Sequence, residues 1–319
     1  MLEEIRKRWG SPLSTISKCL RGFLVASALC VLIVADFNAI EARVLTWLTD
    51  GDLSIFDDDP YKAVAGEMFG VPKDEVTPEQ RQLGKVAMLA CGYQGGVGAF
   101  QTMAKTYGVS VTDEVAQRVV ELYRAANPNV VRFWKEIERA AIKAAMKPGE
   151  VVKVAAGRIA FRKVGSHLLC QLPSKRVITY PFARVGRKTV RLKDREPFEV
   201  DELRYGSQEV WGWNEETGTY GGKLAENVVQ GIARDLLVNS MMLLDASGAA
   251  IVAHVHDEIV IEVPEYDTSS MAPDMWPGAP YSGTRMTIEE VVRVMEKAPV
   301  WAAGLPLKVE AWKGKRYGK

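Results

Sequence analysis

The sequence lacks several features that would point to a metal-thiolate, secreted or membrane protein. Its 319 residues include only four cysteines, Cys19, Cys30, Cys91 and Cys170, without CxxC spacing or nearby histidines. Neither a zinc site nor a disulfide framework is expected, and a reducing compartment fits best. The longest apolar run, residues 22–35, is too short to span a membrane and has no cleavage site for a secretory signal. We interpret it as a buried strand in a cytoplasmic protein without a membrane partner.

An excess of charge of one sign is also missing. With 41 Lys and Arg residues against 40 Asp and Glu residues, the net charge is +1. This excludes strong long-range electrostatic attraction of nucleic acid by the net charge of the protein. Binding of nucleic acid must therefore come from local basic patches. The chain is long enough for two domains or one large domain with insertions, and its 47% hydrophobic content can fill a core.

Acidic residues stand at the ends of two apolar segments. Asp36 follows the strand-like run 31–35, and Asp257 and Glu258 interrupt the alternating stretch 254–263. A polar hairpin turn explains the second pair equally well when it is taken alone. If the two strands are neighbours, Asp36 and Asp257 converge. Together they can then hold divalent cations about 3.5 to 4 Å apart for phosphoryl transfer.

A row of side chains repeats every four residues along a predicted helix that begins near residue 78. It consists of Arg81, Lys85, Leu89 and Tyr93, which drift slowly around one helix face over roughly 18 Å. Such a row can follow a triphosphate and its base, with two cations for phosphate oxygens and two flat or apolar groups for the base. A basic row on a helix is more often only a solvated face.

The order and spacing of these stretches resemble the three polymerase motifs of family A DNA polymerases, most closely the phage branch of that family. Asp36-Phe-Asn-Ala-Ile-Glu-Ala-Arg43 is similar to the first motif, the row from Arg81 to Tyr93 to the second, and Val255-His-Asp-Glu258 to the third. The segment from Asn227 to Asp235 resembles the helix that reads the primer-template minor groove. The resemblance covers essentially the whole chain.

The resemblance implies an α+β polymerase right-hand fold, with an antiparallel-sheet palm and mainly helical fingers. Residues 1–53 and 223–319 would form the palm, residues 54–183 the fingers, and residues 184–222 an inserted β-hairpin region. The chain begins only about 35 residues before Asp36, so the thumb and the exonuclease domain of the family are expected to be absent. Weak, distributive DNA binding is then expected, unless a separate thumb or exonuclease polypeptide is a partner.

The implied function is that of a template-directed DNA polymerase core, which adds deoxynucleotides to a primer 3′ end by two-metal-ion phosphoryl transfer. The implied partners are primer-template DNA and deoxynucleoside triphosphates, and the cofactor is a pair of Mg²⁺ ions, with Mn²⁺ as a substitute. Phage DNA replication in the cytoplasm of an infected bacterial host is the expected setting. The alternative is a truncated polymerase fragment that binds DNA or a partner subunit without efficient catalysis.

Catalytic roles are implied at the matching positions of the first and third motifs. Asp36 and Asp257 would hold the two Mg²⁺ ions with the backbone carbonyl of Phe37, and Glu258 would be a weaker supporting acid. Lys85 would bind the triphosphate and give a proton to the leaving pyrophosphate.

Substrate roles are implied for the second motif and its neighbours. Arg81 would bind the triphosphate, Leu89 would pack on the nucleotide, and Tyr93 would lie beside the templating base. Glu41 would exclude ribonucleotides, which argues against a single-subunit RNA polymerase. DNA contacts are implied for Arg43, Asn227, Gln230 and His256, with Lys223 and Arg21 as further candidates.

Two positions depart from the family pattern. Leu89 replaces the usual aromatic residue, so rate and sugar discrimination are expected to differ from the common pattern. Gln94 stands where the family has Gly, which puts the usual sharp end of the second-motif helix in doubt.

Overall fold

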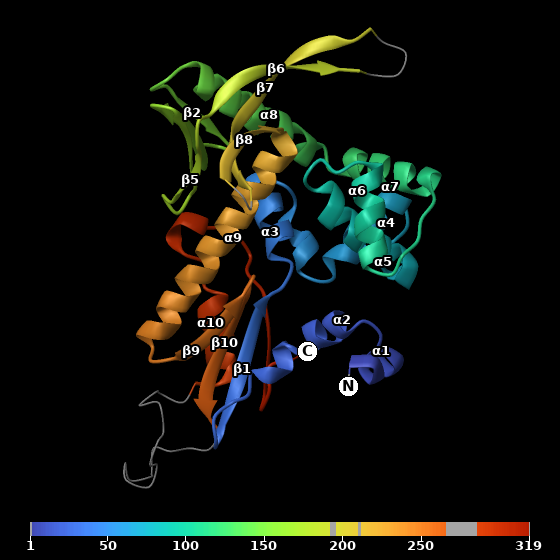
Figure 1. Cartoon of the computed structure of the whole chain (residues 1–319), viewed down its shortest axis with the longest axis vertical. Helices are drawn as coiled ribbons and strands as arrows, with labels where there is room; N and C mark the ends of the chain where they lie inside the picture. Colours follow the sequence, from blue (N-terminus) through green and yellow to red (C-terminus); the bar gives the residue numbers. More distant parts are fainter. Residues whose placement is uncertain (1, 192–195, 210–211, 266–285, 319) are drawn as a thin grey trace. The chain divides into compact units, whose positions relative to one another are not determined.

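The computed structural model describes residues 2–191, 196–209, 212–265 and 286–318. Contacts along the chain divide it into two compact units (Figure 1). The first unit combines Met1–Ile40, Arg234–Pro299 and Leu307–Lys319, and the second combines Glu41–Ala233 and Val300–Pro306.

A four-stranded antiparallel sheet forms the centre of the first unit. The strand order is β11-β1-β10-β9, with bounds β1 Cys30–Phe37, β9 Ala250–Val255, β10 Glu258–Pro264 and β11 Val309–Gly314. Strand β1 is apolar and mostly buried, and it pairs with a neighbouring strand on each side. Its pairing places Asp36 opposite Glu258 on β10 and opposite Glu310 on β11. The two acid-bearing strands are therefore neighbours, which meets the condition set by the sequence analysis.

The prediction of a buried strand over residues 22–35 is wrong for its first part. Strand β1 begins only at Cys30, and Phe23, Leu24, Val25 and Leu29 are exposed. Before β1, Val25 forms an isolated bridge with the C-terminal segment. A strand needs neighbours on both sides and cover on both faces to be fully buried, and hydrophobicity alone does not supply them. The preceding short helices are α1 Leu2–Trp9, α2 Pro12–Cys19 and η1 Arg21–Phe23.

Helices make up the N-terminal part of the second unit. They are α3 Ile40–Leu48, η2 Leu53–Phe56, α4 Pro60–Phe69, η3 Lys73–Glu75, α5 Pro78–Cys91, α6 Val97–Thr106, α7 Asp113–Ala126 and α8 Pro128–Met146. Helix α5 begins where the sequence predicts, because Thr77 and Gln80 form a capping box around Pro78. Helix α6 follows the glycines after α5 and was not predicted.

Helices α4 and α5 pack closely at Gly84. A side-chain carbon at this position would lie 2.5 Å from the carbonyl oxygen of Tyr61, so only glycine allows the two backbones to approach this far. The core beneath α5 includes Val86, Phe100 and Val120. This packing fixes the face of α5 that carries the predicted basic row.

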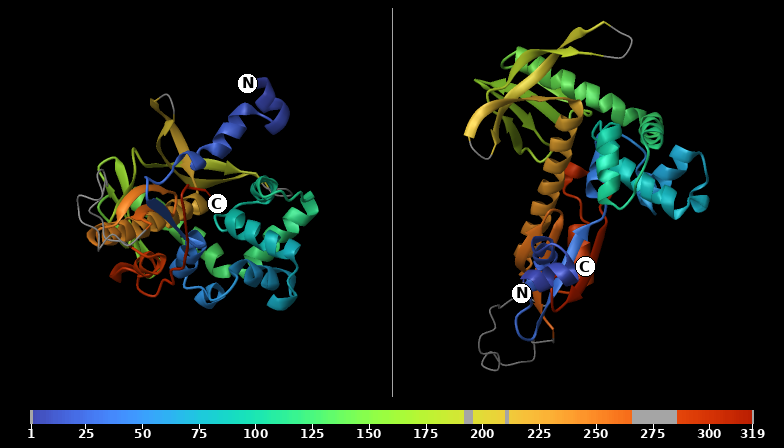
Figure 2. Two further views of the ribbon diagram at one scale, coloured as in Figure 1. Left: turned by 90° about the horizontal axis from the view of Figure 1, so that it is seen from below. Right: turned by 45° about the vertical axis from the view of Figure 1, so that its right-hand side comes forward.

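The part of the second unit between residues 151 and 219 is mostly β-structure. One antiparallel sheet contains β2 Val151–Val154, β3 Ile159–Val164, β4 His167–Gln171 and β5 Val177–Tyr180. The region expected to be an inserted hairpin is a three-stranded sheet of β6 Arg184–Val190, β7 Phe198–Glu209 and β8 Gly212–Thr219. Strands β6 and β7 lie beside α8 (Figure 2).

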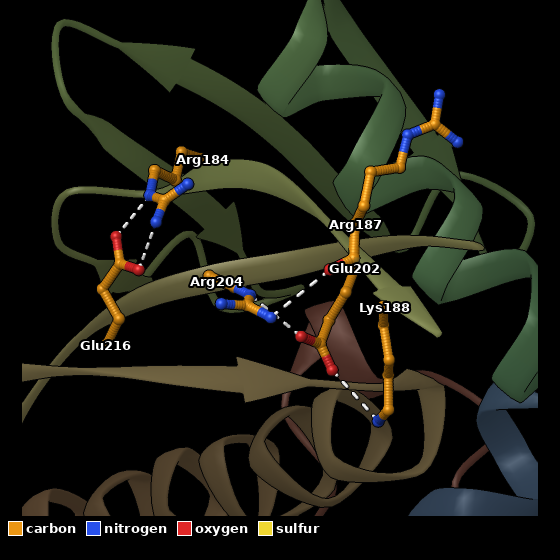
Figure 3. Close-up of polar contacts among 6 residues, drawn as sticks. All are labelled: Arg184, Arg187, Lys188, Glu202, Arg204 and Glu216. Carbon is orange, nitrogen blue, oxygen red and sulfur yellow. Dashed lines mark hydrogen bonds and ion pairs between the residues drawn. The ribbon is translucent and has the colours of Figure 1, made fainter. Parts of the chain in front are cut away.

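Charged side chains of this three-stranded sheet pair with one another. The buried carboxylate of Glu202 lies between Lys188 at 3.0 Å and Arg204 at 2.9 Å, and Arg184 is paired with Glu216 (Figure 3). Exposed pairs of this kind contribute little to stability, whereas a buried carboxylate needs its cations. The basic residues of β6 therefore serve first as partners for acids of the same sheet.

Helix α9, Gly221–Ala246, follows β8 and leads into β9, and α10, Ile288–Met295, packs on β11 and β1, followed by η5 Val300–Ala302. Helix α9 is the longest of the described helices at 26 residues. None of the helices in the described ranges is long and apolar enough to cross a membrane.

Candidate functional site

The two aspartates meet at one end of the sheet in the first unit. Asp36 is the penultimate residue of β1, and Asp257 lies in the two-residue turn between β9 and β10. His256, the other turn residue, adopts a left-handed conformation with φ 54°, which allows this tight reversal. The backbone N–H of Phe37 donates to the carbonyl oxygen of Asp257 at 3.3 Å. The turn is therefore fastened directly to the end of β1.

The candidate metal ligands at this end of the sheet all offer oxygen atoms, namely the carboxylates of Asp36 and Asp257 and the backbone carbonyl of Phe37. Across the described part of the chain, no three His, Cys, Asp or Glu side chains form a group that could hold a metal ion. Mg²⁺ does not require such a group, since it is commonly bound by one or two carboxylates together with water and substrate phosphates. The chemistry of these residues fits Mg²⁺.

Glu258 has a buried partner that sequence reasoning missed. Glu258 is only 5% exposed, and its carboxylate accepts a hydrogen bond from the hydroxyl of Tyr317. Burial, followed by the interactions with Glu258, raises the pKa of Tyr317 to about 12, so the phenol keeps the proton that it donates. The guanidinium of Arg21 lies 5.3 Å from the centre of the Tyr317 ring. A tyrosine in the basic C-terminal tail carries no motif that could have revealed this contact.

The predicted cation row lies on α5 in the second unit. Arg81, Lys85 and Leu89 are partly exposed, and Tyr93 follows just after the helix end. The ammonium of Lys85 lies 5.5 Å from the ring centre of Tyr61 and 5.0 Å from that of Tyr107. Cations over aromatic faces at such distances are attracted by the ring quadrupole. The two rings were not identified from the sequence, and they restrict where the Lys85 ammonium can lie.

Arg81 is held by the carboxylate of Asp59, the N-cap residue of α4. Its Nε donates to Oδ2 of Asp59 at 2.5 Å, and its guanidinium lies 5.4 Å from the Tyr61 ring centre. Burial alone would raise the pKa of Asp59, but the bonds from Arg81 and from the backbone of Lys62 outweigh it and lower the pKa. An anion that binds Arg81 therefore competes with an ionised partner already in place.

Glu41 of α3 and Tyr93, which follows the end of α5, form a hydrogen bond within the second unit. The hydroxyl of Tyr93 donates to Oε2 of Glu41 at 2.9 Å. Burial, and then the nearby Glu41 carboxylate, raise the pKa of Tyr93 well above its ordinary value. The phenol thus remains a donor and fixes the orientation of the Glu41 carboxylate.

The candidate DNA contacts differ in their exposure. Arg43 is only 3% exposed; its guanidinium lies 4.7 Å from the Phe56 ring centre and donates to the carbonyl oxygen of Pro306 at 3.4 Å. Asn227 is partly exposed, and its amide donates to the hydroxyl of Tyr180 at 3.2 Å. The other four are exposed to solvent: Arg21, Lys223, Gln230 and His256.

The fold is that of a polymerase domain. The chain matches the solved structure of the POL domain of Pol1 from M. smegmatis in complex with DNA primer-template and dNTP, with a TM-score of 0.55 and 19% identity. The match covers 94% of this chain and 42% of that chain.

Comparison of the sequence with known proteins shows which family of polymerases the chain resembles. The model of DNA polymerase family A matches residues 11–167. The DNA polymerase of Bacillus phage SP02 is 35% identical over 324 residues, which cover 99% of this chain and 46% of the relative. DNA polymerase I of Pseudomonas aeruginosa is 35% identical over 108 residues, 33% of this chain and 11% of the relative. The chain belongs to DNA polymerase family A, and it spans less than half the length of these relatives.

Proposed function

We propose that this chain is the core of a template-directed DNA polymerase, which adds deoxynucleotides to a primer 3′ end. The observation that carries the proposal is the meeting of Asp36 and Asp257, through the β1–β10 pairing and the bond from Phe37 N–H to Asp257. Membership of the family and the cation row on α5 support it. Phage DNA replication is the proposed setting, given the similarity to a phage DNA polymerase.

The residues divide the work of phosphoryl transfer between them. Asp36, Asp257 and the carbonyl of Phe37 would hold Mg²⁺, with Glu258 as a supporting acid. The chemistry that two Mg²⁺ ions supply when bound is activation of a hydroxyl and stabilisation of charge on the leaving pyrophosphate. Lys85 binds phosphate oxygens and gives a proton to the leaving pyrophosphate.

Substrate selection falls to the side chains around the row on α5. Arg81 exchanges its bond to Asp59 for one to the triphosphate, Leu89 packs on the nucleotide, and Tyr93 lies beside the templating base. Contacts to primer-template DNA are proposed for Asn227, Gln230, His256, Lys223, Arg21 and Arg43.

We also propose the subdomain roles expected from the family resemblance. Residues 1–53 and 223–319 act as the palm, residues 54–183 as the fingers, and residues 184–222 as an inserted β-region. The apolar face that Leu89 offers in place of an aromatic ring makes packing on the base weaker than stacking.

Primer extension tests the proposal directly. With a labelled primer on a longer template, Mg²⁺ and deoxynucleoside triphosphates, the chain is expected to extend the primer according to the template sequence. Binding of the primer-template without extension would instead support a fragment that binds DNA without turnover. Extension only with ribonucleotides would indicate an RNA polymerase.

Glu41→Ala is expected to raise ribonucleotide incorporation relative to deoxynucleotide incorporation by about 10- to 200-fold, the range that one steric contact in a pocket provides. The carboxylate that Tyr93 holds in place would close the space beside C2′ of the sugar. Single-nucleotide incorporation with matched ribo- and deoxyribonucleotides measures the ratio. The control is Glu79→Ala, which removes an exposed acid from the first turn of α5. Unchanged sugar selectivity in Glu41→Ala would refute the assignment.

A further inference from the structure

The turn after α5 contains a residue in an unfavourable backbone conformation. Helix α5 ends at Cys91, and Gln94 adopts a left-handed conformation with φ 67°. For a residue with a side chain this conformation costs roughly 1–2 kcal/mol relative to a right-handed one. The sequence put a sharp end of this helix in doubt, because Gln94 replaces the glycine of the family motif. In the structure the chain nevertheless turns at this position.

The side chain of Gln94 makes a contact that glycine could not make. Its Oε1 accepts a hydrogen bond from the backbone N–H of Gly222 at 2.9 Å. Gly222 lies in the first turn of α9, where backbone N–H groups have no partner within the helix. The positive end of the helix dipole also favours an acceptor at this place. Gln94 therefore caps α9 from a different element of the same unit.

Two glycines let the first turn of α9 touch this region with its backbone. A side-chain carbon at Gly222 would lie 2.2 Å from the carbonyl oxygen of Tyr93, and one at Gly221 would lie 2.0 Å from that of Trp134. The indole N–H of Trp134 in turn donates to the carbonyl oxygen of Gly92 at 2.9 Å. The start of α9 is thus in close backbone contact with Tyr93, just after α5, and with Trp134 of α8, which is itself hydrogen-bonded to Gly92.

We propose that Gln94 is a positioning residue that joins the end of α5, with Tyr93 and its partner Glu41, to the first turn of α9. The inference rests on the proposed function, in which Tyr93 lies beside the templating base and α9 reads the duplex through Asn227. A displacement of the duplex-reading helix would then move the residue that contacts the templating base. The bond offsets the backbone conformation that Gln94 must hold.

Gln94→Gly is the sharpest test, because it removes the bond and the backbone strain together. The melting temperature is expected to stay within about 2 °C of the wild type, since the two changes oppose each other. Incorporation of the correct nucleotide, measured as kcat/KM, is expected to fall by about fivefold or more through lost positioning. Gln94→Glu keeps an acceptor at the same place and should restore the wild-type value. A fully active Gln94→Gly, or a Gln94→Glu equally impaired, would overturn the proposal.

A matched control acts on the same helix end without touching the turn at Tyr93. Glu138 of α8 accepts a bond from the backbone of Gly221, which lowers the pKa of its carboxyl against a larger rise caused by burial. Glu138→Ala also removes a cap from α9 and is expected to leave correct-nucleotide kcat/KM within about twofold, while lowering the melting temperature by about 2–8 °C. If Glu138→Ala reduced incorporation as much as Gln94→Gly, general loosening of the helix end would explain both.

Hydrogen–deuterium exchange separates this inference from the proposed function. In the free protein, peptides that cover residues 221–226 should exchange faster in Gln94→Gly than in the wild type or Gln94→Glu. This readout needs no catalysis, so it tests the bond even if the wild-type chain fails to extend a primer. Unchanged exchange in all three proteins would contradict the contact, whereas an inactive wild type with the expected exchange pattern would contradict only the proposed function.

Discussion

Replacing Asp257 with asparagine is expected to abolish template-dependent primer extension, with a loss of at least about 10³-fold in kcat. Asparagine has nearly the same volume, and the carbonyl oxygen that accepts from the Phe37 N–H belongs to the backbone. The turn between β9 and β10 is therefore expected to persist, while the charge that we propose holds Mg²⁺ is removed. Single-turnover extension at saturating nucleotide measures the loss in the chemical step.

The control for this variant is another acid of the first unit. Asp245 is exposed near the end of α9, and Asp245→Asn removes the same charge with the same change in volume. It is expected to extend primers like the wild type. Equal melting temperatures for the two variants would show that the fold is retained in both. Extension by Asp257→Asn at the rate of the control would remove this carboxylate from the mechanism.

Lys85→Ala is expected to lower kcat/KM for deoxynucleotide incorporation by about 10²- to 10³-fold, the range for loss of one charge-stabilising group at a reacting centre. The ammonium is held between the rings of Tyr61 and Tyr107, so little conformational freedom is lost when it meets a phosphate. Lys85→Arg keeps the charge but changes its shape and proton affinity, and should recover only part of the activity. Incorporation of one nucleotide at varied concentration measures both variants.

The matched control for the lysine is Lys105→Ala, which removes an exposed ammonium from α6. Its kcat/KM is expected to remain within about twofold of the wild type, because screened surface charges contribute little. A Lys85→Ala variant that resembled this control would mean that the row on α5 is a solvated face.

Local patterns in the sequence were sufficient to predict the strand that carries Asp36 and the helix that carries the row from Arg81 to Leu89. Strand β1 was predicted from its apolar run and α5 from its four-residue repeat, and the structure confirms both. The stretch around Asp257 had two readings, a hairpin turn and a metal site. The structure shows the turn, with a backbone hydrogen bond from Phe37 to Asp257, so the first interpretation is confirmed. The metal site stays a prediction.

Contacts between distant residues could not be predicted in the same way. Tyr317 and Glu258 are 59 positions apart, and their contact depends on how the C-terminal segment packs on the sheet. The burial of Arg43 against Phe56 likewise has no local signal. The left-handed conformation of Gln94 goes against the ordinary backbone preference of a residue with a side chain. The hydrogen bond to Gly222, which depends on the tertiary structure, offsets that preference. Local sequence predicts elements, whereas the partners of individual side chains depend on packing.

The register of β1 has a consequence for how this protein can change. The register of β1 pairs Asp36 with Glu258 on one neighbouring strand and with Glu310 on the other. Side chains along β1, from Cys30 onward, point alternately to the two faces of the sheet. Removing or adding a single residue in this strand would turn Asp36 to the opposite face, since side chains alternate with a period of two. Exchanges of one apolar residue of β1 for another are therefore expected to disturb the position of Asp36 far less than insertions or deletions in the strand. The apolar composition of this strand can vary, whereas its number of residues must stay constant if Asp36 is to keep its face of the sheet.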